Sequence, residues 1–170
     1  QKEDYGFYFN CLMEFNPDGE RFESLLMNLI QKTDFQSSRM WEIVWRRRQD
    51  CNQSFAGIWE FIQSLDDERI GLAIQTLSSS TNGIEKSDDF ENIIMLLENS
   101  NPELRDIAAK SLTKTTNTEF DEKAWPLILT ELKRRPSEQL IKTAYRYYKF
   151  DHKLVEISDY FLELLKNKEF

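Results

Sequence analysis

The chain has 170 residues, of which 40% are apolar and 13% aromatic, enough to build a packed core and too many for a disordered chain. Only five glycines and four prolines interrupt it, which favours long continuous helices over many short strands. The net charge of −8 argues against nucleic acid as a partner, because an acidic field repels phosphate groups.

No apolar run approaches the ~20 residues that a membrane span needs, so we expect a protein that stays out of the membrane. Cys11 and Cys51 lie far apart with no partner motif around either. Isolated cysteines of this kind are usually buried small hydrophobic residues. They suit a reducing compartment, and we expect a cytoplasmic protein.

Apolar residues recur at the helical period along most of the chain, and capping and turn residues divide it into segments. Residues 5–15 are ambiguous between helix and strand, and their aromatic content predicts a cap over residues 1–18. Helix pairs are expected at about 19–50, 53–79, 87–115 and 119–150, and a terminal helix at about 152–168. Pro126 lies inside the predicted helix Glu119–Arg135, where it predicts a kink or a late start.

The chain also shows self-similarity at a helix-pair spacing. Shifted by 35 residues, Glu68–Leu77 lies over Glu103–Leu112 with Glu, Ala and Leu identical. The first helices of successive pairs begin near residues 20, 53, 87 and 119, a period of 32 to 34. A period of this length with two helices per unit is typical of a solenoid, in which each pair buries the apolar face of the next.

The segment from Asn101 to Thr115 resembles the second helix of HEAT repeats. The residues that carry the resemblance are Pro102, Leu104, Arg105, Ala108 and Leu112. It departs from the family at Asn99, where HEAT repeats often have Asp, and at Ile70, which replaces the Arg of the neighbouring unit. The resemblance implies an all-α protein of paired antiparallel helices, in one short right-handed HEAT-like or armadillo-like solenoid over residues 1–170. An irregular helical bundle is the alternative.

Excess negative charge is confined to one window. Residues 50–106 sum to −9, and the rest of the chain sums to +1. Acids in this window cluster at predicted helix starts, which stacking would bring near one edge to form a binding surface for a cationic partner. The candidate acids are Asp66, Asp67, Glu68, Asp88, Asp89, Glu91, Glu103 and Asp106. Each is also explained by capping its own helix, and the charge by solubility.

A second candidate is the aromatic and basic run from Tyr145 to Tyr148. With Ile141, Ala144 and Tyr148 facing inward, Arg146 and Tyr147 are expected to point outward. Tyrosine and arginine are enriched at binding hot spots, so these two residues are added to the candidate surface. The basic runs that end at Arg48 and Arg135 are typical of helix C-termini rather than of a nucleic-acid patch.

Residues suited to catalysis are few. His152 is the one histidine, no cysteine pair has metal-ligand spacing, and the glycines form no phosphate-binding loop. We therefore expect no catalytic residues, no metal, no cofactor and no enzymatic activity.

The sequence thus predicts a non-catalytic protein-binding module, monomeric on its own. In charge and helical build the chain is similar to bacterial immunity proteins of contact-dependent growth inhibition systems. That resemblance implies that an acidic surface covers the active site of a basic toxin nuclease. The alternatives are a HEAT-like DNA glycosylase, for which the acidic centre has the wrong sign, and a scaffold or adaptor segment of a larger assembly.

Overall fold

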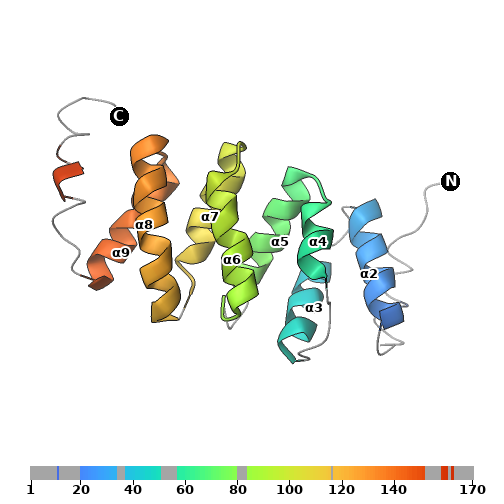
Figure 1. Ribbon diagram of the computed structural model, residues 1–170. Helices are drawn as coiled ribbons and strands as arrows, with labels where there is room; N and C mark the ends of the chain where they lie inside the picture. The colour runs from blue at the N-terminus through green and yellow to red at the C-terminus, as the bar shows by residue number, and fades with distance from the viewer. Residues whose placement is uncertain are drawn as a thin grey trace. The chain divides into compact units, whose positions relative to one another are not determined.

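A computed structural model describes residues 11, 20–33, 37–50, 57–79, 84–115, 117–151, 158–160 and 162. Regular structure in these residues is helical, apart from an isolated bridge between Ile84 and Thr115 (Figure 1). This confirms the all-α prediction. The predicted cap apart from Cys11, together with Cys51, His152 and most of the predicted terminal helix, lies outside the described residues. No helix among the described residues is long and apolar enough to cross a membrane.

The chain divides into two compact units, residues 1–83 and 84–170, which are described separately. The first contains α2 (Glu20–Lys32), α3 (Ser37–Asp50), α4 (Ile58–Gln63) and α5 (Asp67–Ser79). The second contains α6 (Ser87–Met95), the 3-10 turn η1 (Leu96–Glu98), α7 (Pro102–Leu112), α8 (Thr118–Arg134) and α9 (Glu138–Asp151).

Local sequence explains where several helices begin. Gly57 precedes α4 with a φ of 75°, a left-handed conformation that glycine adopts without a steric penalty. Pro102 opens α7 at the position where a missing N–H costs nothing, and the Asn101 side chain accepts from the Glu103 N–H at 2.9 Å. Asn117 caps α8 in the same way, through the Glu119 N–H at 2.9 Å. The late start considered for the Pro126 helix does not occur, since α8 runs through Pro126.

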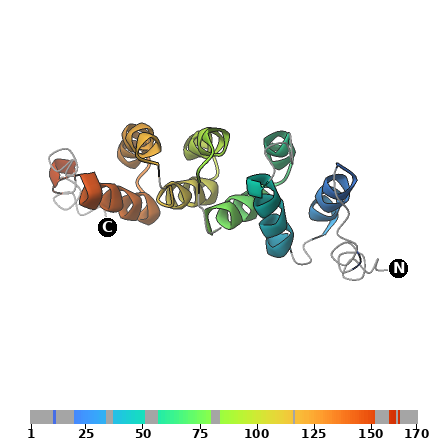
Figure 2. The same cartoon turned by 90° about the horizontal axis from the view of Figure 1, so that it is seen from below.

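In the first unit, α3 and α5 pack side by side around indole rings (Figure 2). Trp41 and Trp45 are buried and stacked with ring centroids 5.7 Å apart, and Trp59 of α4 packs on Trp45 at 5.9 Å. The Trp45 Nε1 donates to the Ala73 carbonyl of α5 at 2.8 Å. In the sequence these three tryptophans fall on apolar helical stripes, which predicts a position in the core, and their burial confirms that prediction.

In the second unit, α6 and α8 lie in one layer and α7 and α9 in the other (Figure 2). Phe90 of α6 stacks on Phe120 of α8 with ring centroids 4.4 Å apart. Hydroxyl groups of α9 bond to backbone of α7: Thr143 Oγ1 donates to the Ala109 carbonyl at 3.3 Å, and the Tyr147 hydroxyl donates to the Leu112 carbonyl at 3.2 Å. In each unit, the second helix of one predicted pair therefore contacts the second helix of the next pair. These helices are α3 and α5 in the first unit and α7 and α9 in the second.

Candidate functional site

Most of the acids proposed as a binding surface are exposed at helix starts. Asp67 and Glu68 lie in the first turn of α5, Asp88 in the first turn of α6, and Glu103 in the first turn of α7. Glu91 is also exposed and lies 4.0 Å from the Lys123 Nζ of α8. All five residues are exposed.

Asp66 has a structural role as well as an exposed position. Its carboxylate accepts from the Arg69 backbone N–H at 3.0 Å and pairs with the Arg69 guanidinium, which caps α5. These two interactions, with the backbone bond the larger, lower the pKa of Asp66. The capping explanation therefore holds for this residue, and any binding role would come in addition.

Asp89 and Asp106 do not belong to an open surface. Asp89 is only 4% exposed. Asp106 is half-buried, and its Oδ1 accepts from the Ser137 hydroxyl at 2.5 Å. Because the Ser137 Oγ in turn accepts from the Leu140 N–H at 3.1 Å, Asp106 supports the start of α9. The Asp106 carboxylate therefore serves the fold of the second unit, and the Asp89 side chain is closed to a partner by burial.

The predicted common edge is not formed within the second unit. Ile84, just before α6, pairs with Thr115, just after α7. The start of α6 therefore lies beside the end of α7, and the helical rise from Glu103 to the last residue of α7, Leu112, is about 14 Å. Asp88 thus lies near one end of the α6/α7 pair and Glu103 near the other, with Glu91 in the middle of α6. Asp66, Asp67 and Glu68 belong to the first unit.

Tyr147 does not point outward as predicted. Its side chain is 7% exposed, packs against Trp125 with ring centroids 5.9 Å apart, and bonds to the Leu112 carbonyl. Burial, followed by the nearby Asp121 carboxylate, raises the pKa of Tyr147 above its usual value of 10.0. Among the described side chains of α9, the buried stripe is Leu140, Thr143, Ala144 and Tyr147, one residue out of phase with the prediction. Tyr145 is exposed, at 58%.

Arg146 remains exposed and lines a cavity of about 390 Å³ in the second unit. The cavity is formed where the end of α7, the start of α8 and the middle of α9 meet. Its lining residues are Thr113, Thr115, Thr118, Asp121, Glu122, Arg146 and Tyr147. The sequence did not single out the threonines or Asp121, because hydroxyl groups in loops carry no periodic signal.

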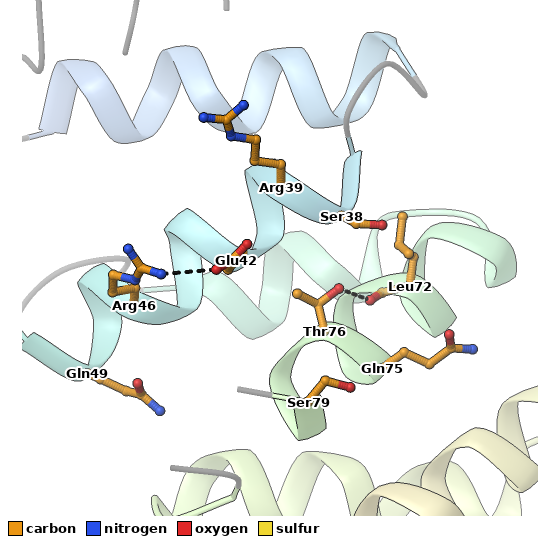
Figure 3. Close-up of a pocket in the computed structure, with 9 residues that line it drawn as sticks. All are labelled: Ser38, Arg39, Glu42, Arg46, Gln49, Leu72, Gln75, Thr76 and Ser79. Carbon is orange, nitrogen blue, oxygen red and sulfur yellow. Dashed lines mark hydrogen bonds and ion pairs between the residues drawn. The ribbon is translucent and has the colours of Figure 1, made fainter. Parts of the chain in front are cut away.

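A larger groove of about 690 Å³ lies between α3 and α5 in the first unit (Figure 3). It is lined by Ser38, Arg39, Glu42, Arg46 and Gln49 from α3 and by Leu72, Gln75, Thr76 and Ser79 from α5. Arg46 pairs with Glu42 at 3.0 Å, and the Thr76 hydroxyl bonds to the Leu72 carbonyl of its own helix at 2.8 Å. None of these residues was predicted as a site residue.

Among the described residues, no group of three or more His, Cys, Asp or Glu side chains is arranged to hold a metal ion. The chain matches no protein-family model, no curated protein and no solved structure.

Proposed function

We propose that this chain is a non-catalytic protein-binding module and that its exposed carboxylates bind a basic protein. The observation that carries the proposal is the exposure of Asp67, Glu68, Asp88, Glu91 and Glu103, all within the −9 window. Exposed acids attract a cationic partner over a Debye length of about 10 Å at 0.1 M salt and raise its association rate.

Contacts between α7 and α9 favour a repeat arrangement of the helices, which would suit this function. In the second unit, three bonds join α9 to α7 at sequence separations of 31, 34 and 35 residues. These separations lie within one residue of the 32 to 34 residue period of the predicted pairs, which favours stacked repeats. Stacked helix pairs present extended surfaces, and such surfaces suit protein binding.

The specific form of the proposal is an immunity protein that neutralises a basic toxin nuclease. A nuclease binds phosphates through lysine and arginine, so exposed carboxylates compete with its nucleic-acid substrate for the same side chains.

Co-purification with matched charge variants tests the proposal. The test variant reverses Glu68, Glu91 and Glu103 to Lys. The control variant reverses Glu119, Glu138 and Asp159, which are exposed acids outside the window, so that both variants gain the same net charge. Each variant has two reversals in the first turn of a helix: Glu68 and Glu103 in the test variant, and Glu119 and Glu138 in the control variant. The unfavourable interaction of the new lysines with the helix dipole is therefore matched between the two variants.

Each tagged chain is purified from the cells that naturally make it, and the retained proteins are identified by mass spectrometry. The proposal expects a protein of positive net charge to be retained by the wild type and the control variant and lost by the test variant. The recovered protein is then assayed for nuclease activity, which an equimolar amount of the chain should abolish. Equal retention by both variants would contradict the acidic-surface proposal, and a recovered basic protein without nuclease activity would contradict its immunity form.

A further inference from the structure

The helices α6 and α8 run side by side and in the same direction, in one layer of the second unit (Figure 2). Near the start of both helices, the Phe90 ring stacks on the Phe120 ring. At the other end, the Arg135 Nη1, just after α8, donates to the Asn99 carbonyl, just after η1, at 3.4 Å. Contacts at both ends therefore hold the two helices in register along their whole length.

Met95 and Leu127 are neighbours on the solvent side of these two helices. Between them, the Glu91 Oε1 of α6 lies 4.0 Å from the Lys123 Nζ of α8. Met95 follows Glu91 by four residues, so it lies one helical turn further along the same face. Leu127 has the same position relative to Lys123. Since Met95 is 59% and Leu127 38% exposed, the two side chains form an apolar pair at the surface.

The apolar pair is not needed to fill the core of the second unit. Helix α6 buries Phe90 and Ile93 on its other side, and α8 buries Trp125 and Ile128. Methionine is flexible and polarisable, which lets it adapt to the shape of a bound partner. Apolar surface that is surrounded by polar residues marks sites of protein interaction. The pair therefore has the character of a contact surface.

The layer that α6, η1 and α8 form is acidic, whichever of its side chains pair with each other. Residues 87–98 carry four acids and no base, and residues 118–135 carry four of each, so the net charge of these residues is −4. Beside the apolar pair, Glu91 and Glu119 share the ammonium group of Lys123, at 4.0 and 3.5 Å. The exposed Glu98, three residues after Met95, forms no ion pair with any other residue that the structure describes. Uncompensated negative charge therefore borders the pair.

We propose that the α6/α8 face binds a basic protein through an apolar side chain of that protein, which packs on Met95 and Leu127 while flanking lysines or arginines meet the carboxylates. This inference rests on the proposed basic partner and adds the contact that retains it. Charge raises the association rate, whereas apolar burial at the contact slows dissociation. A second copy of the chain would bring its own acidic layer against this one, and like charges repel.

The test is nuclear magnetic resonance of the full chain labelled with carbon-13 at the methionine methyl groups. The probe is a short helical peptide with leucine on one face and lysine on the other. Two matched peptides serve as comparisons, one with glutamate in place of lysine and one with serine in place of leucine. The proposal expects a saturable shift of the Met95 methyl signal with the leucine/lysine peptide at low ionic strength, and none for Met40, which is buried in the first unit.

The two comparison peptides should bind at least tenfold more weakly. An unmoved Met95 signal would overturn the proposal, and so would equal binding of either comparison peptide, since charge or apolar character alone would then suffice. A Met95 signal that moves with protein concentration in the absence of peptide would overturn it in favour of a second copy of the chain.

Variants assign the binding to the α6/α8 face. The double variant Met95→Ser and Leu127→Ser should lower the affinity for the leucine/lysine peptide on the order of tenfold, because it removes both apolar contacts. This affinity is measured by fluorescence anisotropy of the labelled peptide. Leu25→Ser with Tyr145→Ser, which also replaces two exposed apolar side chains, is the control and should keep most of the affinity. An equal loss in the two double variants would refute the face as the site.

The same double variants separate this inference from the proposed function. With the basic protein recovered by co-purification, Met95→Ser with Leu127→Ser should dissociate on the order of tenfold faster than the control. Equal dissociation rates would overturn the inference alone and leave the proposed function standing. The proposed function fails instead when the charge variants retain that protein equally.

Discussion

The two units join their second helices by different chemistry. In the first unit, α3 meets α5 through large aromatic rings, and one indole N–H bonds to the Ala73 carbonyl. In the second unit, α9 meets α7 through hydroxyl groups of Ser137, Thr143 and Tyr147. Aromatic burial is large and tolerant of small shifts, whereas a buried hydroxyl is stabilising only when its partner is in place. The α3/α5 contact should therefore tolerate conservative substitutions, whereas the α7/α9 contact should not.

Truncation of Trp45 should produce the largest effect. Trp45→Ala removes a ring that is 1% exposed and leaves a cavity between Trp41 and Trp59, so the free energy of unfolding should fall by about 3–5 kcal/mol. Trp45→Phe, which loses the bond to Ala73 but keeps an aromatic ring, should cost clearly less. Urea denaturation followed by circular dichroism measures both. Equal losses would mean that the hydrogen bond, and not the ring, dominates this contact.

Tyr147→Phe should destabilise the second unit by about 1 kcal/mol at neutral pH, because it removes the bond to the Leu112 carbonyl and keeps the ring. Burial raises the pKa of Tyr147 in the folded state, so its contribution to stability is fully present below the unfolded value of 10.0. That contribution is lost as the pH rises above 10.0, because the unfolded chain releases the proton and the folded chain keeps it.

Unfolding curves of the wild type and Tyr147→Phe, taken at neutral pH and above pH 10.0, check this dependence. The variant should lose less stability than the wild type over that interval. Parallel losses would show that Tyr147 ionises freely and is not buried as described.

Substitutions of Ser137 and of its partner Asp106 should have smaller effects on stability. Ser137→Ala should cost about 1 kcal/mol, because Ser137 both caps α9 through the Leu140 N–H and bonds to Asp106 of α7. Asp106→Ala should remove only the bond between helices. A double-mutant cycle over the two positions should give a coupling energy above zero, and a coupling of zero would mean that the cap acts without α7.

Asp66→Ala should have the smallest effect, about 0.5 kcal/mol, because this cap is exposed and its partner, Arg69, belongs to the same helix. The lowered pKa of Asp66 means that its contribution is present above the unfolded value of 3.8 and is lost as the pH falls. Asp66→Asn keeps an acceptor for the Arg69 N–H, so it should recover part of the stability and lose the acid dependence. An identical acid dependence in wild type and Asp66→Asn would contradict this assignment.

Helical periodicity predicted most of the described helices and the tryptophan core, since apolar side chains at every third or fourth residue leave few other arrangements. It failed on α9 because Thr143 was not counted as inward. When Thr143 is assigned to the buried face together with Ala144, helical spacing places Tyr147 on that face as well. When Ile141 is assigned to it instead, the predicted face shifts by one residue. Asp89 was wrongly predicted as part of an exposed surface, because a polar residue is expected to face solvent. Its side chain is in fact buried. The groove residues carry no such signal, because glutamines and serines on an exposed face are expected in any helix.

The central claim, that exposed acids of the −9 window bind a basic protein, is tested most directly by association kinetics with the basic protein recovered by co-purification. The rate constants are measured for the wild type, for the variant reversed at Glu68, Glu91 and Glu103, and for the control variant reversed at Glu119, Glu138 and Asp159. At low salt the first variant should associate on the order of tenfold more slowly than the control, and the difference should shrink as salt screens the charges. Equal association rates of the two variants at low salt would contradict the claim and leave the acidic window with a role in solubility alone.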